Sequence, residues 1–117
     1  MKKIEAIIRP EQIEDIKESL MPLDLSGISV SQIMGIGCQR GWKEIVRGAE
    51  ADYNFLPKIK LELVVPDGQA EEVIRRITEA AQTGNIGDGK IFVYDVIDAI
   101  RIRTGERGDD AVRANDE

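Results

Sequence analysis

The sequence predicts an α+β domain in which a strand–helix–strand unit occurs twice. Three observations support this prediction: an alternation of charged and apolar residues that ends in proline at 2–10, the same alternation at 58–66, and an amphipathic helical pattern after each. Two such units in 117 residues favour the ferredoxin-like arrangement. That arrangement is a four-stranded antiparallel sheet with both helices on one face.

The first unit runs from the N-terminus to about residue 33. After the strand at 2–10, the residues Ile13, Ile16 and Leu20 recur at helical spacing among charged residues. Ser26-Gly27 then predicts a turn, and the β-branched stretch 28–33 predicts the second strand.

The second unit repeats this order with a more regular helix. Along its first strand, 58–66, one set of side chains is expected under the helices: Ile59, Leu61, Leu63 and Val65. The open face then carries Lys60, Glu62 and Val64, with Ile7 nearby. Its helix is predicted from Ala70, Val73, Ile74, Ile77, Ala80 and Ala81, followed by a turn at Thr83-Gly84 and a strand over 91–97. An open face that mixes apolar and charged residues predicts a homo-oligomer.

Composition limits the classes of function. We expect one domain over residues 1–117, and 42% hydrophobic residues suffice for a core. A net charge of −6 argues against an extended nucleic-acid surface. The single cysteine, Cys38, excludes an intrachain disulfide and favours a reducing, cytoplasmic location. The N-terminus lacks a signal-peptide pattern, no apolar run reaches membrane-spanning length, and histidine is absent.

The stretch 83–90 concentrates three glycines and Lys90 in the turn that precedes a strand. Glycines at positive φ bring backbone N–H groups close to an anion, and successive N–H groups form a concavity with positive partial charge. A purely architectural turn is the alternative. Arg101 and Arg103 alternate with Ile100 and Ile102, which predicts a strand end with both guanidinium groups on one face. Their alternative is a solvated edge.

Two segments are expected to lack regular structure. The stretch 37–55 is too long for a hairpin turn and carries several glycines and charges, so it is either a functional loop or a floppy insertion. The stretch 104–117 has few apolar residues and is expected to be weakly ordered unless a ligand holds it.

These segments together resemble the nitrogen-regulatory PII signalling proteins. The matching blocks are residues 3–10, 35–41, 47–50, 55–58, 83–93 and 101–106, in order along the chain. In the terms of that family, residues 37–55 are the T-loop, 83–90 the phosphate-binding B-loop, and 102–117 the C-terminal loop and tail. The resemblance implies a homotrimer that binds ATP or ADP between subunits and senses 2-oxoglutarate beside the nucleotide.

The resemblance assigns residues to each ligand. For the nucleotide it implies Ile7, Ser29, Gly35, Gly37, Cys38, Gln39, Glu62, Val64, Gly87, Asp88, Gly89, Lys90, Arg101 and Arg103. For 2-oxoglutarate it implies Gly37, Gln39, Arg40, Gly41, Lys58 and Gly87. Mg²⁺, which prefers oxygen ligands, would take one from Gln39 and the others from the two ligands. Without the resemblance, each residue has a simpler interpretation. Gln39 would be a solvated amide, Lys58 a surface charge, and Glu62 and Lys60 a cross-strand pair.

The resemblance also implies that the T-loop contacts regulated proteins through Glu44, Arg47 and Glu50. Targets such as an ammonium transporter or a nitrogen or arginine-pathway enzyme are expected, without membrane insertion or nucleic acid. Ala51 and Ala49 stand where relatives carry a uridylylated tyrosine and a phosphorylated serine, so neither modification is expected at these positions. Cys38 replaces a common arginine that reaches the phosphates, and Trp42 and Val46 make the loop more apolar, which suggests a distinct partner.

Other classes of function were weighed. A nucleotide sensor with a partner outside nitrogen metabolism remains an alternative. A small ferredoxin-like phosphatase would need a placed nucleophile or base, and none is evident in a chain without histidine, so no enzyme activity is expected. An RNA-binding domain shares the fold, and Phe92 and Tyr94 share a strand face, but 4% aromatic residues and an acidic charge disfavour it.

Overall fold

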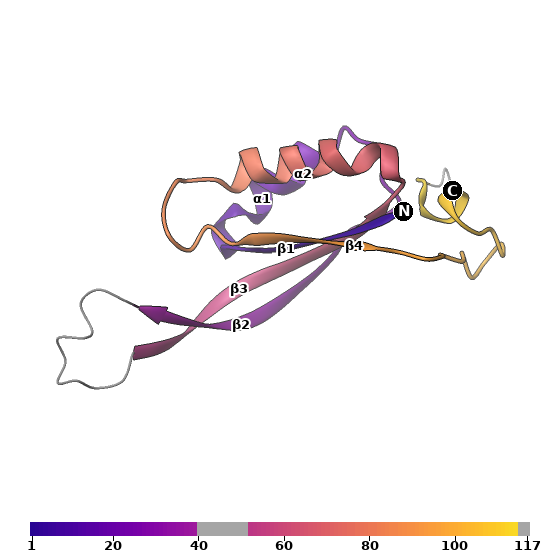
Figure 1. Ribbon diagram of the computed structural model, residues 1–117. Helices are drawn as coiled ribbons and strands as arrows, with labels where there is room; N and C mark the ends of the chain where they lie inside the picture. The colour runs from indigo at the N-terminus through magenta and orange to yellow at the C-terminus, as the bar shows by residue number, and fades with distance from the viewer. Residues whose placement is uncertain (40–51, 115–117) are drawn as a thin grey trace.

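The computed structural model describes residues 1–39 and 52–114. The chain folds as a twisted four-stranded sheet with two helices on one face and a short helix near the C-terminus (Figure 1). In chain order the elements are β1 (Lys2–Ile8), the 3₁₀ turn η1 (Pro10–Gln12), α1 (Ile13–Leu20), β2 (Ser29–Gln39), β3 (Asp52–Val65), α2 (Asp67–Ala81), β4 (Lys90–Asp95) and α3 (Asp109–Val112).

The sheet has the order β2-β3-β1-β4, and every neighbouring pair is antiparallel. This is the double strand–helix–strand arrangement that the sequence predicts. β1 and β3 form the centre of the sheet, where Ile8 lies opposite Ile59 and Ile7 lies opposite Lys60. The second and fourth strands differ from the predicted bounds, since β2 continues to Gln39 and β4 ends at Asp95.

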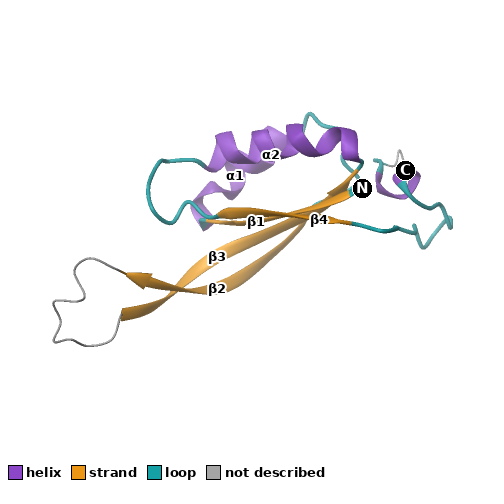
Figure 2. Ribbon diagram, in the orientation of Figure 1, coloured by secondary structure: helices purple, strands orange, loops and turns teal. Residues whose placement is uncertain are grey.

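The core lies between the sheet and the two helices, as the two periodicities predict. Side chains alternate between the two faces of a strand, and they return to the same face of a helix every 3.6 residues. Alternate residues of β1 and β3 and one stripe of each helix are therefore buried where the sheet meets the helices. The buried set is Ile4, Ala6, Ile8, Ile16, Leu20, Ile59, Leu61, Leu63, Val65, Ala70, Val73, Ile77 and Ala81. No helix of the described residues lies over the other face of the sheet (Figure 2).

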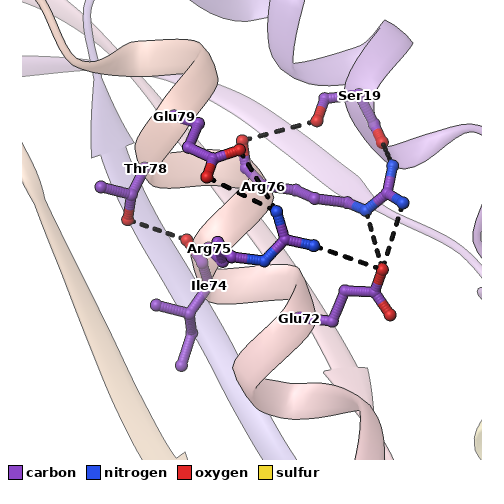
Figure 3. Close-up of polar contacts among 7 residues, drawn as sticks. All are labelled: Ser19, Glu72, Ile74, Arg75, Arg76, Thr78 and Glu79. Carbon is purple, nitrogen blue, oxygen red and sulfur yellow. Dashed lines mark hydrogen bonds and ion pairs between the residues drawn. The ribbon is translucent and has the colours of Figure 1, made fainter.

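Polar contacts join the two helices at their exposed edge (Figure 3). Arg76 of α2 donates through Nη1 to the backbone oxygen of Ser19 in α1 at 2.8 Å, and its Nε donates to Glu72 at 3.1 Å. Arg75 lies 3.3 Å from Glu79 one turn further along α2. The contact to Ser19 fixes how α1 lies against α2, which keeps both helices over the same side of the sheet.

The strands β2 and β3 extend beyond the helices as a two-stranded arm (Figure 1). Backbone pairing continues to Gln39 opposite Asp52, so both ends of the predicted 37–55 loop are strand. The expectation of an irregular loop is wrong for these ends, because the antiparallel ladder satisfies their backbone groups. Residues 40–51 lie outside the described residues. Five apolar side chains of these two strands are exposed: Val30, Met34 and Ile36 on β2, and Phe55 and Leu56 on β3.

Candidate functional site: the turn before β4

The turn at 83–89, which joins α2 to β4, has the backbone that the sequence predicts for an anion site. Gly84, Gly87 and Gly89 have φ of 89°, 102° and 106°. A side chain at such angles is strained, so glycine is required at these positions. Gly89 also lies against β1, because a Cβ atom there would stand 1.8 Å from the Ile7 backbone oxygen. The turn is therefore held close to β1, and Lys90 begins β4 directly opposite Ile7.

The carboxylate of Asp88 closes the turn from inside. It accepts hydrogen bonds from the Thr83 hydroxyl, from the Thr83 backbone N–H at 2.7 Å and from the Gly84 N–H at 2.8 Å. These bonds, together with the nearby Arg9 guanidinium, lower the pKa of Asp88 to about 2. The carboxylate of Asp88 therefore binds within the turn and stabilises its shape. The expected contact of Asp88 with a nucleotide stays a prediction.

Two cations donate to carbonyl groups of the same turn. Arg9 Nη2 lies 2.6 Å from the Ile86 oxygen, and Lys58 Nζ lies 2.9 Å from the Gly87 oxygen. The sequence grouped Lys58 with Gly87, and the structure brings them into contact. Arg9 was missed, because an arginine at the end of a strand carries no motif of its own. The signal that could have found it is its place in the 3–10 block beside the proline.

The open face of the sheet carries a charged cluster on β1 and β3. Glu62 of β3 lies 2.9 Å from Lys3 Nζ across the sheet and 3.6 Å from Lys60 on its own strand. The hydrogen bond from Lys3 is the main cause of the lowered pKa of Glu62. The alternative that pairs Glu62 with Lys60 is thus confirmed as an ion pair, but the two residues share β3, and the cross-strand partner of Glu62 is Lys3. Val64 and Ile7 are half-buried on the same face, as expected.

The remaining nucleotide residues of the first half lie along β2. Ser29 is exposed at the start of β2, opposite Glu62, and Gly35 lies opposite Leu56, with Lys58 Cγ 3.5 Å from where a Cβ would stand. Gly37, Cys38 and Gln39 are placed by their backbone pairing with residues 54, 53 and 52. Several assigned positions lie outside the described residues: Arg40, Gly41, Glu44, Arg47, Ala49, Glu50 and Ala51.

Arg101 and Arg103 are not in a strand. Arg101 begins a turn that the Gly105 N–H closes onto the Arg101 oxygen at 2.7 Å, and Ile100 pairs instead with Arg107. The expected alternation on one face is wrong, because the positive-φ residues Gly105 and Gly108 reverse the chain. The turns at 83–89 and 100–108 lie at opposite ends of β4 (Figure 1).

The Arg101 side chain holds the C-terminal segment. Its Nη2 donates to the backbone oxygens of Arg113 at 2.8 Å, Asp110 at 3.3 Å and Ala111 at 3.4 Å, and its Nη1 lies 3.5 Å from Glu106. Val112 in α3 is buried. Residues 104–114 thus form a turn and a short helix that Arg101 contacts. Whether this segment is weakly ordered without a ligand stays a prediction.

No described helix is long and apolar enough to span a membrane. Among the described residues, no group of three or more His, Cys, Asp or Glu side chains could hold a metal ion.

The fold and this turn define a class: a ferredoxin-like protein whose second unit carries a glycine-rich turn with two cations bound to its carbonyls. The chain matches the family model described as nitrogen regulatory protein P-II over residues 1–106, and it belongs to that family. It is 56% identical to the P-II protein of Rhodospirillum rubrum and 50% identical to P-II 1 of Escherichia coli K12. Each alignment spans 112 residues, 96% of this chain and the whole of the relative.

Solved structures agree in fold. The Bacillus subtilis GlnK–ATP complex superposes with a TM-score of 0.82 at 34% identity, covering 94% of this chain and 96% of that one. Arabidopsis thaliana PII bound to citrate superposes with a TM-score of 0.78 at 40% identity, covering 99% and 93%. The chain is a nitrogen regulatory signalling protein of this family.

Proposed function

We propose that the chain binds ATP or ADP between the subunits of a homotrimer, senses 2-oxoglutarate beside the nucleotide, and reports to target proteins through residues 37–55. The observation that carries this proposal is the turn at 83–89. Three glycines have positive φ, a carboxylate closes the loop from inside, and Arg9 and Lys58 donate to its carbonyls. We propose that the N–H groups of the turn that are not bonded within it, such as that of Gly87, bind one small anion. Lys90 adds a full charge beside it.

The separation of the cationic groups supports a site between subunits. Within one chain, the turn at 83–89 and the arginines Arg101 and Arg103 lie at opposite ends of β4 (Figure 1). A second copy, placed head to tail, would bring its arginines to the first copy's turn, and such an interface closes into a ring. The exposed apolar residues of β2 and β3 supply the surface that such an interface would bury.

The solved relatives support the ligand classes. One is a complex of GlnK with ATP, and another is PII bound to citrate, a small carboxylate. By analogy we assign the phosphates to Gly87, Gly89 and Lys90, with Arg101 and Arg103 from the neighbouring copy. Asp88 supports them through the loop. The purine and ribose would lie against Ile7, Ser29, Gly35, Glu62 and Val64, with Gly37, Cys38 and Gln39 at the base of the arm.

The 2-oxoglutarate site is proposed at that base. Lys58 would bind one carboxylate of 2-oxoglutarate. The backbone from Gly37 to Gly41, together with Arg40 and Gly87, would bind the other end of the molecule. Bound Mg²⁺ would bridge the nucleotide and 2-oxoglutarate, with Gln39 as its protein ligand. Lys58 would then exchange its bond to the Gly87 oxygen for a carboxylate, which links this site to the phosphate turn. Such coupling acts in both directions.

The regulated partner is proposed to contact residues 37–55, including Glu44, Arg47 and Glu50. An ammonium transporter or a nitrogen or arginine-pathway enzyme would fit this role. The proposal assigns no catalysis to the chain and places it in the cytoplasm, with no modification at Ala49 or Ala51.

Titration calorimetry tests the proposal. We expect 2-oxoglutarate to give binding heat only when Mg²⁺ and ATP are both present. Lys90→Ala or Arg103→Ala should each weaken ATP binding by about 1.5–3 kcal/mol, the usual size of a charge-assisted hydrogen bond. A matched control is Arg75→Ala, which removes an exposed charge on α2 far from the turn. Heat from 2-oxoglutarate alone would contradict the bridging role of the metal.

A further inference from the structure

We infer that Arg9 is a positioning residue of the phosphate turn: its guanidinium fixes the peptide unit between Ile86 and Gly87 so that the Gly87 N–H faces the anion. This inference rests on the proposed function, because it concerns the same turn. It assigns Arg9 a role distinct from touching the ligand.

Arg9 reaches the turn from a distant part of the sequence. It follows β1 and immediately precedes Pro10, whose fixed φ begins the 3₁₀ turn η1. From there its Nη2 donates to the Ile86 oxygen at 2.6 Å, and its Nε lies 3.5 Å from Asp88 Oδ1. Its side chain is 28% exposed. The guanidinium thus donates a hydrogen bond to the peptide before Gly87 and lies at ion-pair distance from the carboxylate that closes the turn, while its buried Nε has no hydrogen-bond partner among the described residues.

The guanidinium also packs directly on Gly87. A Cβ atom at Gly87 would lie 2.9 Å from Arg9 Nη2 and 3.4 Å from Arg9 Cζ. Gly87 therefore needs to be glycine for two reasons, its φ of 102° and the arginine beside it. The space that a side chain would fill at this position is occupied by Arg9.

The geometry of the peptide bond converts this contact into an orientation. In a planar trans peptide the C=O and the N–H point in opposite directions. Because Arg9 holds the Ile86 oxygen, the N–H of Gly87 in the same peptide unit points to the other side. Lys58 holds the Gly87 oxygen of the next unit, but the N–H of that unit, on Asp88, donates within the turn to the Asn85 oxygen at 3.3 Å. The Gly87 N–H is therefore the group that the Arg9 contact would orient toward an anion.

The charges around Arg9 favour an indirect effect, through the shape of the turn, over direct attraction of the anion. The Asp88 carboxylate, whose pKa is lowered partly by Arg9, offsets the guanidinium charge locally. What remains specific to Arg9 is the planar shape of its donors, which can contact Ile86 and Asp88 together. A lysine carries the same charge but offers a single point donor.

The test compares Arg9→Gln and Arg9→Lys with the matched control Arg75→Gln, which changes the same charge on the exposed face of α2. Calorimetry with MgATP measures the dissociation constant, and NMR of the ligand-free protein follows the Gly87 amide, with Gly27 as internal reference. Urea unfolding checks that each variant is folded. Both Arg9 variants should weaken MgATP binding on the order of tenfold and shift or split the Gly87 resonance, while Arg75→Gln and the Gly27 resonance match the wild type.

The outcomes separate the two claims. If Arg9→Lys binds MgATP like the wild type, charge alone matters and the inference is overturned. It is also overturned if the Gly87 resonance is unchanged in both variants. If the wild type itself binds no MgATP, the proposed function fails and takes the inference with it. If the wild type binds MgATP and the Arg9 variants bind it equally well, only the inference about Arg9 is overturned.

Discussion

Two turns occupy equivalent places in the repeat, and only one has the glycine backbone that we propose for an anion site. The turn from α1 to β2 contains Gly27, which does not have positive φ and whose Cβ position is open. It is held by backbone bonds at Leu23 and Leu25, whose side chains pack on the core. The turn from α2 to β4 instead has three positive-φ glycines and a closing carboxylate. The repeat supplies the fold twice and the site once.

The largest expected effect is on stability, when one glycine in each turn is replaced by alanine. Gly89→Ala should destabilise the protein by about 2–5 kcal/mol, because the new Cβ would be strained at positive φ and would collide with the Ile7 backbone oxygen. Gly27→Ala should change stability by less than about 1 kcal/mol, or stabilise it slightly. Urea unfolding measures both. Equal stability for the two variants would remove the structural distinction between the turns.

Acid dependence should also distinguish the turns. The pKa of Asp88 is about 2 in the folded chain and near 3.8 without its partners. Because the folded pKa is depressed, Asp88 stabilises the fold above pH 3.8, and this contribution disappears as pH falls toward about 2. Asp88→Asn should lose part of this acid-dependent step in urea midpoints measured from about pH 5 to pH 2.

Asp24→Asn, the same change in the first turn, is the control for that series. Its midpoints should follow those of the wild type through the whole range. An Asp88→Asn profile that also coincides with the wild type would show that the carboxylate does not hold the turn.

How much of this was predictable from sequence depends on the kind of signal. The double unit followed from periodicity, because buried stripes such as Val73 and Ile77 repeat at fixed spacing. The glycines of the turn followed from composition. The contact of Arg9 with the turn could not be predicted, because it joins segments far apart in the chain. The hydrogen bonds of the Asp88 carboxylate within the turn could not be predicted either, because they depend on the fold of the loop.

The contacts of the C-terminal segment were not predicted, for a similar reason. Few apolar residues suggested weak order, yet Val112 is buried and Arg101 holds three carbonyls at the end of α3. Local composition does not reveal that one side chain satisfies these backbone groups. The arm was also underestimated, since strand pairing to Gln39 comes from the register with β3.

A third turn, at 100–108, also contains glycines at positive φ, Gly105 and Gly108. Within the chain its Arg101 donates to the C-terminal segment, and Arg107 pairs with Asp98. The smallest effect on the stability of the fold is expected from Arg101→Ala, which should release α3 and leave the rest of the domain folded, besides weakening the phosphate contact proposed above. Limited proteolysis should then cut near residue 110 faster than in the wild type, with Arg107→Ala as the control. Equal cleavage would mean that Arg101 does not hold this segment.

The most direct test of the central claim, that two copies share each nucleotide site, is a mixing experiment. Lys90→Ala chains lack a cation at the turn, and Arg103→Ala chains lack one at the other end, so neither homotrimer should bind ATP tightly. When the two are unfolded and refolded together, each mixed trimer should regain about one wild-type site, where an intact turn meets an intact Arg103. Calorimetry of the mixture should therefore reveal a population of tight sites. If the mixture binds no better than its parents, the phosphates are not held between subunits and the account is contradicted.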